Sequence, residues 1–128
     1  RRQADPNLLR TLEERALGLM AELVDEPLPL RVKNALRQLL KDGLPRKERV
    51  AEQFAMTVRT LQRQLQQAGT SYQQILDDLR QELAEHYLRH SDLPIQDIAH
   101  YLGFTEPRSF HRAFKSRTQL TPGEYRQG

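Results

Sequence analysis

The chain contains one pattern twice, as VAEQFAMTVRTLQRQL at residues 50–65 and as IAHYLGFTEPRSFHRAF at residues 98–114. Each copy begins with an aliphatic residue followed by Ala, passes through a short turn to Thr, and ends in a stretch that mixes apolar residues with Arg. The copies lie 48 residues apart at the Ala and the Thr and 49 residues apart in the closing stretch, so the second copy has one extra residue near Pro107. A short helix, a tight turn and a second helix with outward Arg form a helix-turn-helix unit. Two such units suggest a ligand with a long repeat, such as duplex DNA.

The rest of the chain also has apolar residues at helical spacing, and no stretch shows the alternation of a strand. Thr57 is placed to cap a helix, because its hydroxyl can accept a hydrogen bond from a free backbone N–H two or three residues later. We predict an all-α fold with two helix-turn-helix subdomains joined by a long linker helix, about seven helices, preceded by an extra N-terminal helix. The expected helices lie at about residues 5–25, 30–41, 46–54, 57–67, 71–90, 95–102 and 106–117, with a final turn at 121–125.

Two prolines, Pro27 and Pro29, mark a boundary after the first helix, which is acidic and amphipathic. Because the chain also begins without Met, we expect residues 1–27 to be a linker helix from an upstream domain that is missing here; packing of this helix on the rest is the alternative. Residues 28–128 are expected to form one tandem DNA-binding domain. Its parts are a first unit at about 46–68, the linker helix at about 71–90 and a second unit at about 95–117.

The predicted linker helix has the length of a DNA repeat. It contains about 20 residues, and a rise of 1.5 Å per residue makes it roughly 30 Å long. One turn of B-DNA is about 34 Å. We therefore expect the second helices of the two units to enter successive major grooves on one face of the duplex.

Positive charge is concentrated in the part of the chain that holds the repeat. Residues 1–27 contain four Arg against six Asp or Glu, whereas residues 28–128 contain sixteen Lys or Arg against eleven acidic residues. A basic balance favours phosphate contact only weakly, because solvated surfaces are routinely charged.

Other classes of function are disfavoured by what the sequence lacks. The 128 residues include no Cys, which excludes disulfides, thiolate nucleophiles and Cys-bound zinc. No apolar run reaches the roughly 18 residues that span a bilayer, and no signal segment is evident. His86 and His90 have the spacing of a metal pair but no third ligand, and no Gly-rich phosphate loop is present. We expect a cytoplasmic, nucleoid-associated protein without catalysis, cofactor or metal.

The early, outward positions of the second helix in each unit are those that meet base edges. An Arg donates two hydrogen bonds to guanine, and Gln pairs with adenine in the same two-point manner. Any one such residue alone is more often an ordinary solvated side chain, but a place behind a helix start in a repeated motif favours base reading. The candidates are Arg59, Gln62 and Arg63 in the first unit and Arg108, His111 and Arg112 in the second.

Phosphate contacts are expected at the edges of the same helices, where basic and hydroxyl side chains lie. For Arg46 and Lys47, an ordinary solvated helix start is an equally good interpretation. The candidates are Arg46, Lys47, Thr57, Thr60, Ser109 and Lys115.

These motifs resemble the DNA-binding region of the AraC/XylS family of bacterial transcription regulators. The strongest likeness runs from Pro94 to Arg126, and residues 57–65 resemble the first reading helix of the family. Together the similar segments cover about residues 30–127. The segments that carry the likeness are Ile98-Ala99, Leu102-Gly103-Phe104, Ser109-Phe110, Arg112-Ala113-Phe114-Lys115 and Leu120-Thr121-Pro122-Gly123-Glu124-Tyr125-Arg126.

The resemblance implies a seven-helix fold and promoter binding that alters transcription, commonly by activation. It places the family's base-contacting positions on the same six candidates. The partners that it implies are double-stranded promoter DNA, RNA polymerase and a large upstream domain for effector binding or dimerisation.

The sequence departs from the family pattern at two positions. Ala55 occupies a position where the family usually has Gly, so a positive φ there would strain the first turn. Pro107 stands where the family often has a polar, DNA-facing residue, and one base contact is expected to be absent. Next to it, Glu106 is better suited to complement a helix N-terminus than to accept from cytosine.

One rival interpretation belongs to a different class of function. The two units could form a helical protein-interaction module, with the Arg side chains as solvated bystanders. Binding to duplex DNA that weakens steeply with salt would reject this alternative.

Overall fold

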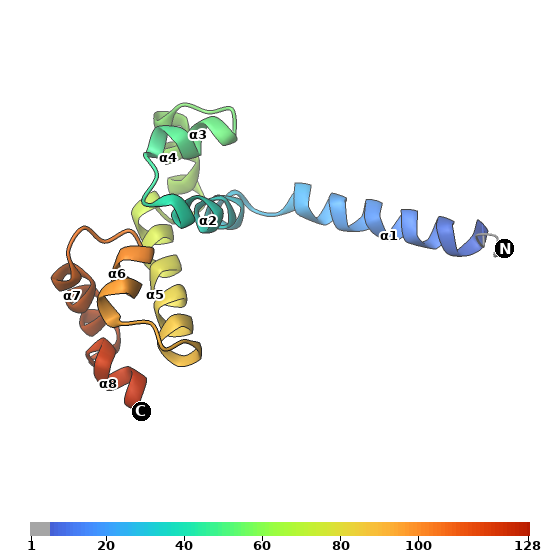
Figure 1. Cartoon of the computed structure of the whole chain (residues 1–128). Helices are drawn as coiled ribbons and strands as arrows, with labels where there is room; N and C mark the ends of the chain where they lie inside the picture. The colour runs from blue at the N-terminus through green and yellow to red at the C-terminus, as the bar shows by residue number, and fades with distance from the viewer. Residues whose placement is uncertain (1–5) are drawn as a thin grey trace.

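The computed structural model describes residues 6–128, and within the first helix it describes no side chain of residues 18–25. The described residues form eight α-helices and one short 3₁₀-helix, η1, and contain no strand (Figure 1). The all-α prediction, with seven helices after an extra N-terminal one, is therefore confirmed. The bounds are α1 Pro6–Asp25, α2 Leu28–Leu39, η1 Leu40–Asp42, α3 Lys47–Gln53, α4 Val58–Gln67, α5 Tyr72–His90, α6 Ile95–Tyr101, α7 Pro107–Thr118 and α8 Pro122–Gln127.

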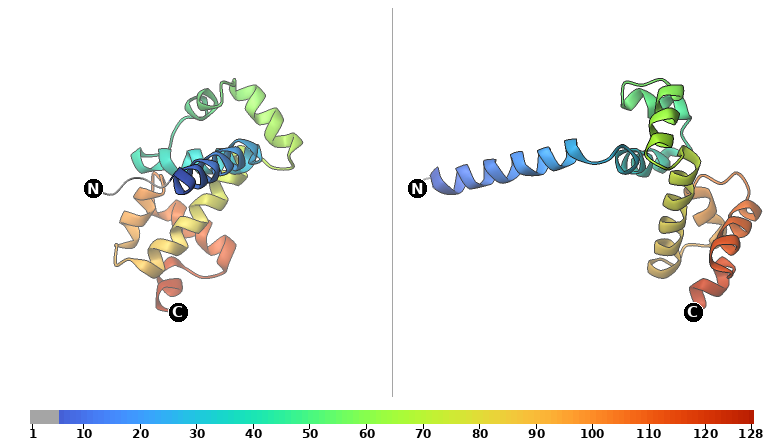
Figure 2. Two further views of the ribbon diagram at one scale, coloured as in Figure 1. Left: turned by 90° about the vertical axis from the view of Figure 1, so that its right-hand side faces the viewer. Right: turned by 180° about the vertical axis from the view of Figure 1, so that it is seen from behind.

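Helix α1 extends away from the other helices, as Figure 1 and the right-hand view in Figure 2 show. Its leucines up to position 17 are at least half exposed; they are Leu8, Leu9, Leu12 and Leu17. The expected start at Asp5 and the side chains of Leu19, Met20 and Leu23 lie outside the described part of the chain. No helix within the described residues is both long and apolar enough to cross a membrane.

Helix α2 begins two residues earlier than the sequence predicts. Pro27 takes the N-cap position and Pro29 lies in the first turn. The expectation that Pro29 precedes the helix was wrong, because a proline is tolerated where the backbone N–H has no helical partner.

The buried side chains form two separate apolar clusters. The first cluster combines α2, α3, α4 and the N-terminal half of α5; its buried members are Val32, Leu36, Leu39, Leu40, Val50, Ala51, Leu61, Leu65, Tyr72, Ile75, Leu76 and Leu79. The second combines the C-terminal half of α5 with α6 and α7; its buried members are Ala84, Leu88, Ile98, Ala99, Leu102, Phe110 and Phe114. Helix α5 thus passes from one core to the other, and Figure 1 shows α3 and α4 at one end of the molecule and α6, α7 and α8 at the other.

Side-chain caps fix three of the helix starts. The Thr57 hydroxyl accepts from the Thr60 N–H at the start of α4, as predicted, and Ser71 accepts from the Gln74 N–H at the start of α5. Before α8, Thr121 and Glu124 form a reciprocal capping box. These bonds satisfy backbone donors that a helix start leaves free.

Candidate nucleic-acid interface

Helix α4 has one buried and one exposed side. Leu61 and Leu65 are four residues apart, so they share a face, and both are buried in the first core. The opposite side carries the three base-reading candidates, Arg59, Gln62 and Arg63, and all three are exposed. The local sequence thus positions the polar residues by anchoring the helix through its two leucines.

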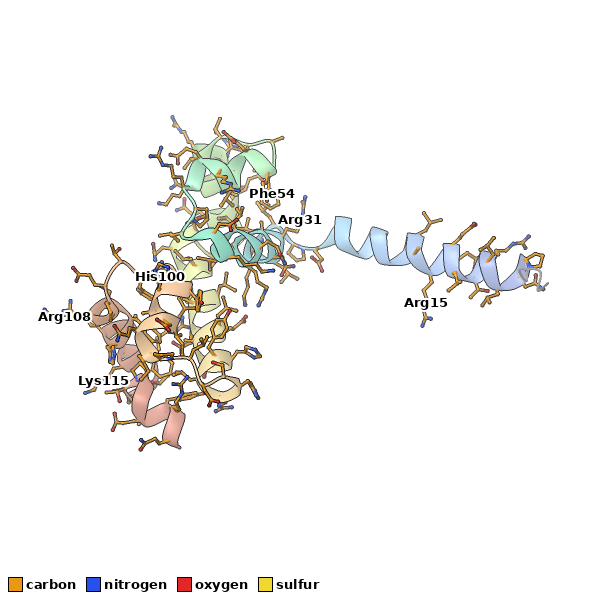
Figure 3. All side chains as sticks on the ribbon, in the orientation of Figure 1. Arg15, Arg31, Phe54, His100, Arg108 and Lys115 are labelled. Atoms are coloured by element: carbon orange, nitrogen blue, oxygen red, sulfur yellow. The ribbon has the colours of Figure 1, made fainter. Side chains whose placement is uncertain are left out.

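Helix α7 repeats this arrangement with aromatic anchors. Phe110 and Phe114 are buried in the second core, with ring centroids 5.9 Å apart. Arg108, His111 and Arg112 are exposed around them. Figure 3 shows Arg108 projecting outward from α7, on the side away from α5. Pro107 occupies the first turn of the helix, as the sequence predicts.

The six base-reading candidates are not engaged elsewhere in the chain. Among the described residues, the ion pairs join only Lys33 and Arg37 to Glu82, and Arg117 to Asp78. None of the six makes a side-chain hydrogen bond within residues 6–128. Their donors are therefore available to a ligand, which is the chemical requirement for reading base edges.

The phosphate candidates differ in how free they are. Arg46, Lys47, Ser109 and Lys115 are all exposed, but the Lys47 ammonium also lies over the ring of Tyr72, 5.7 Å from its centroid. Lys47 also lines a hollow of about 340 Å³ beside α4.

The two threonines among the phosphate candidates are bonded to each other. The Thr57 hydroxyl donates to the Thr60 hydroxyl at 3.0 Å and at the same time accepts from the Thr60 N–H. Thr57 therefore acts as the helix cap, while the Thr60 hydroxyl keeps its own proton to donate.

Two arginines with structural roles were missed by sequence reasoning. Arg126 donates to the carbonyls of Leu88 and Leu93 at 3.2 and 2.7 Å, and to those of Tyr87 and Ser91, and so closes the C-terminal end of α5. No local signal separates this Arg from a DNA-binding one, because its partners lie 33 to 39 residues away.

Arg80, on α5, holds the turn of the second unit. Its Nε donates to the Leu102 carbonyl at 2.9 Å and its Nη2 to the Gly103 carbonyl at 3.2 Å. The guanidinium also lies 4.2 Å from the ring centroid of Phe104. Burial lowers the pKa of Arg80 from its ordinary value, against the opposing effect of the Asp77 and Tyr72 charges.

Comparison with known proteins finds a matching family and related transcription regulators. The family description "Helix-turn-helix domain" matches residues 50–128. The chain is 39% identical over 126 residues to the ornithine utilization regulator of Pseudomonas aeruginosa, covering 97% of this chain and 37% of that protein. It is 44% identical over 80 residues to the HTH-type transcriptional activator RhaS of Escherichia coli, covering 62% of this chain and 29% of that protein. The chain thus spans well under half the length of these relatives.

Solved structures show the same arrangement of helices. The transcriptional regulator CdpR from Pseudomonas aeruginosa is 37% identical, with a TM-score of 0.70 over 78% of this chain and 31% of that one. The DNA-binding domain of AdpA, solved in complex with a target DNA, is 27% identical, with a TM-score of 0.68 over 80% of this chain and 92% of that one.

Proposed function

This chain belongs to the AraC/XylS family of transcription regulators, and we propose that it recognises double-stranded promoter DNA through α4 and α7 in successive major grooves. The observation that carries the proposal is the pair of exposed polar faces on these two helices, whose base-reading candidates make no side-chain hydrogen bond or ion pair within residues 6–128. The AdpA domain, which binds DNA, has the same arrangement of helices and supports the proposal.

In this proposal, each reading helix presents a different set of donors to the bases. Helix α4 uses Arg59, Gln62 and Arg63, which suit guanine and adenine. Helix α7 uses Arg108, His111 and Arg112 and has no polar side chain at Pro107. Because the two sets differ, the preferred site is directional rather than palindromic, and one chain covers both halves of it.

Phosphate contacts hold the chain on the duplex without selecting a sequence. We assign them to Arg46, Lys47 and Thr60 beside α4, and to Ser109 and Lys115 on α7. Thr57 contributes by capping α4 and thereby placing the Thr60 hydroxyl.

The whole protein acts, in this proposal, as a bacterial activator in the cytoplasm, on nucleoid DNA. RhaS, which this chain resembles over 80 residues, is a transcriptional activator. An upstream domain for effector binding or dimerisation and a contact with RNA polymerase complete the proposed assembly, and no catalytic step is assigned to this chain.

Selection from random duplex DNA, followed by binding measurements on the enriched site, tests the assignment. We expect two short blocks with centres about 10 base pairs apart. Arg63→Ala and Arg112→Ala should each lose about 1–3 kcal/mol of discrimination, at base pairs in different blocks. Lys47→Ala should weaken binding to selected and random DNA alike, with a smaller salt dependence.

Two results would contradict the proposal. Equal losses on selected and random DNA for all three variants would remove the base-reading roles. An absence of salt-dependent binding to any duplex would favour the alternative of a helical protein-interaction module.

A further inference from the structure

The two apolar cores bury successive stretches of α5, and about one turn of the helix separates these stretches. The last buried α5 residue of the first core is Leu79, and the first of the second core is Ala84. Between these positions only Leu83 packs on both cores, and it is partly buried. Apolar contact between the two units includes Leu83 and the turn at Gly103, which lies beside Leu40 and Leu44 of the first unit. Polar contacts along this turn of α5 add to what fixes how the two units are oriented.

On one side of this turn, the first unit is joined to α5 by two ion pairs. Lys33 and Arg37, both on α2, donate to the two carboxylate oxygens of Glu82; the Arg37 contact is 3.4 Å. Burial would raise the pKa of Glu82, but the hydrogen bonds and charges of Lys33 and Arg37 outweigh it and lower the pKa below its ordinary value.

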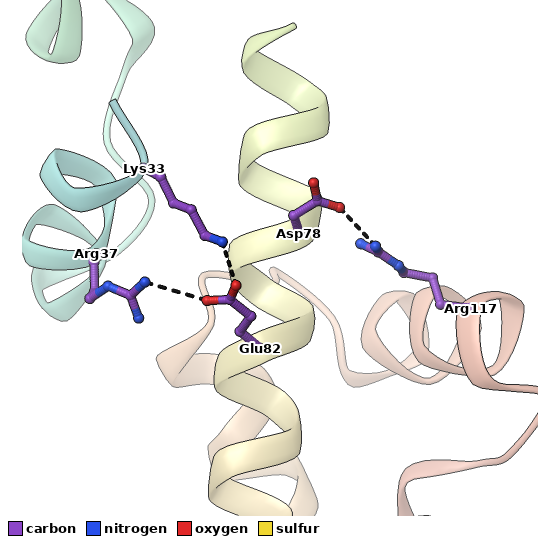
Figure 4. Close-up of polar contacts among 5 residues, drawn as sticks. All are labelled: Lys33, Arg37, Asp78, Glu82 and Arg117. Atoms are coloured by element: carbon purple, nitrogen blue, oxygen red, sulfur yellow. Dashed lines mark hydrogen bonds and ion pairs between the residues drawn. The ribbon is translucent and has the colours of Figure 1, made fainter. Parts of the chain in front are cut away.

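On the other side, the second unit is joined to the same stretch of α5. The Arg117 guanidinium, near the end of α7, donates to the Asp78 carboxylate at 2.7 Å. Arg80 binds the carbonyls of Leu102 and Gly103 in the turn before α7. Figure 4 shows the Glu82 and Asp78 contacts on opposite sides of α5, with α2 on one side and α7 on the other.

We propose that Asp78, Arg80 and Glu82, here called the α5 junction, are positioning residues that fix the angle between α4 and α7 and so set the spacing of the two DNA blocks. This inference rests on the proposed function, because it concerns how the two reading helices are aligned on one duplex. None of the three residues needs to touch DNA in this role.

The effect is one of geometry more than of stability. Ion pairs between partly exposed side chains add little to the free energy of folding. One extra base pair, however, displaces the second block by about 3.4 Å along the axis and turns it by about 34°. A rigid pair of units cannot follow that change, whereas a pair free to pivot about α5 can follow part of it.

The test uses the whole chain and the duplex that it enriches from random DNA, together with the same duplex carrying one extra base pair between the blocks. The quantity measured is the ratio of the two dissociation constants. We expect Asp78→Asn and Glu82→Gln each to reduce this ratio by about two- to fivefold, in line with the usual contribution of such pairs.

One control tests the effect of net charge, and a second tests the ion pair itself. Asp92→Asn removes the same charge from an exposed loop residue and should leave the ratio unchanged. The exchange of Asp78→Arg with Arg117→Asp keeps the net charge and an ion pair, and it should restore the ratio toward the wild-type value.

A measurement without DNA reports on the junction alone. Because the chain has no Cys, Gln67→Cys on α4 and Gln127→Cys on α8 allow two spin labels to be attached at exposed positions. The distance distribution between the labels should broaden in the Asp78→Asn and Glu82→Gln backgrounds and stay narrow with Asp92→Asn.

The outcomes separate the inference from the proposed function. If the wild-type chain enriches no two-block site, the proposed function fails, and the proposed control of spacing fails with it. If it enriches such a site but the spacing ratio and the label distances are the same in all variants, only the α5 junction is overturned. A ratio that changes equally with Asp92→Asn also overturns it, because charge alone would then explain the effect.

Discussion

The two helix-turn-helix units have the same turn but meet different neighbours there. In the first unit the Ala55 N–H donates to the Glu52 carbonyl, and in the second the Gly103 N–H donates to the His100 carbonyl, each at 3.0 Å. Both residues have positive φ, 54° for Ala55 and 83° for Gly103. The Ala55 side chain is exposed, however, whereas a Cβ on Gly103 would lie 3.2 Å from the Leu44 Cβ.

This difference shows that two turns can have the same backbone conformation although only one of them requires glycine. Positive φ alone costs a non-glycine residue about 1–2 kcal/mol, which the first unit tolerates. In the second unit the turn is also pressed against the first unit, through Leu44 and Leu40, and against Arg80. In this chain a residue other than glycine thus occupies only the turn that faces solvent.

The cores beneath the two units differ as well. The first anchors its reading helix with Leu61 and Leu65, and the second uses Phe110 and Phe114. The Phe110 ring lies in a chain of aromatic contacts, with centroids 5.6 Å from Phe104 and 5.9 Å from Phe114. Truncation in the second unit therefore removes more contact area per residue.

The largest predicted effect comes from truncating these anchors. Phe110→Ala should lower the free energy of unfolding by about 3–5 kcal/mol, and Leu61→Ala by about 2–5 kcal/mol. Because the two cores are separate, the unit that carries the substitution should unfold locally before the other unit does. Amide hydrogen exchange read residue by residue should show lost protection in α6 and α7 for Phe110→Ala and in α3 and α4 for Leu61→Ala.

If either variant lowers hydrogen-exchange protection equally in both units, the two cores do not open separately. Such a result would mean that α5 couples the clusters into one cooperative unit despite the gap after Leu79. An exposed truncation, Gln67→Ala, should leave protection in both units unchanged and serves as the control.

Reciprocal substitutions in the two turns give the next effect. Gly103→Ala should destabilise the chain by about 2–4 kcal/mol, because positive φ and the contact with the Leu44 Cβ act together. Ala55→Gly should stabilise it by about 0.5–1 kcal/mol, since relief of positive φ is partly offset by the greater freedom of Gly in the unfolded chain. Urea unfolding of both variants measures the two free energies.

The relative size of the two changes in unfolding free energy shows whether the surroundings of the two turns differ. A cost for Gly103→Ala no larger than the gain from Ala55→Gly would show that the contact with Leu44 carries no weight.

Sequence periodicity predicted the helices well because each one is decided locally. Leu61 and Leu65 define the buried side of α4 through their spacing, and Thr57 defines its start through its hydroxyl. The exposure of Arg63 and Arg112 follows from the same periodicity. The family pattern raised a positive φ at Ala55 only as a condition for strain, and the structure shows that this φ is positive.

The contacts that join the two units could not be predicted in this way. Lys33 and Glu82 are 49 residues apart, and Arg117 and Asp78 are 39 residues apart. Each of these side chains is also a plausible solvated charge, and only the crossing of α2 and α7 over α5 brings the partners together. The roles of the six base-reading candidates stay predictions, because exposure and a free donor are necessary for them but do not select a base.

The smallest effect concerns the caps of the two reading helices. Helix α4 is capped by the Thr57 hydroxyl, whereas Glu106 at the same position before α7 makes no side-chain capping bond. Thr57→Ala should lower the free energy of unfolding by about 1 kcal/mol.

Glu106→Asp keeps the charge and shortens the side chain so that it can accept from a backbone N–H in the first turn of α7. It should raise the free energy of unfolding by about 0.5–1 kcal/mol. Thermal unfolding at matched pH measures both changes, and a Glu106→Gln variant measures what the charge of Glu106 contributes without a change in side-chain length. If Glu106→Asp gives no stabilisation while Thr57→Ala is costly, the start of α7 is held by Pro107 and the Phe110 anchor rather than by its cap, and the two reading helices begin by different physical means.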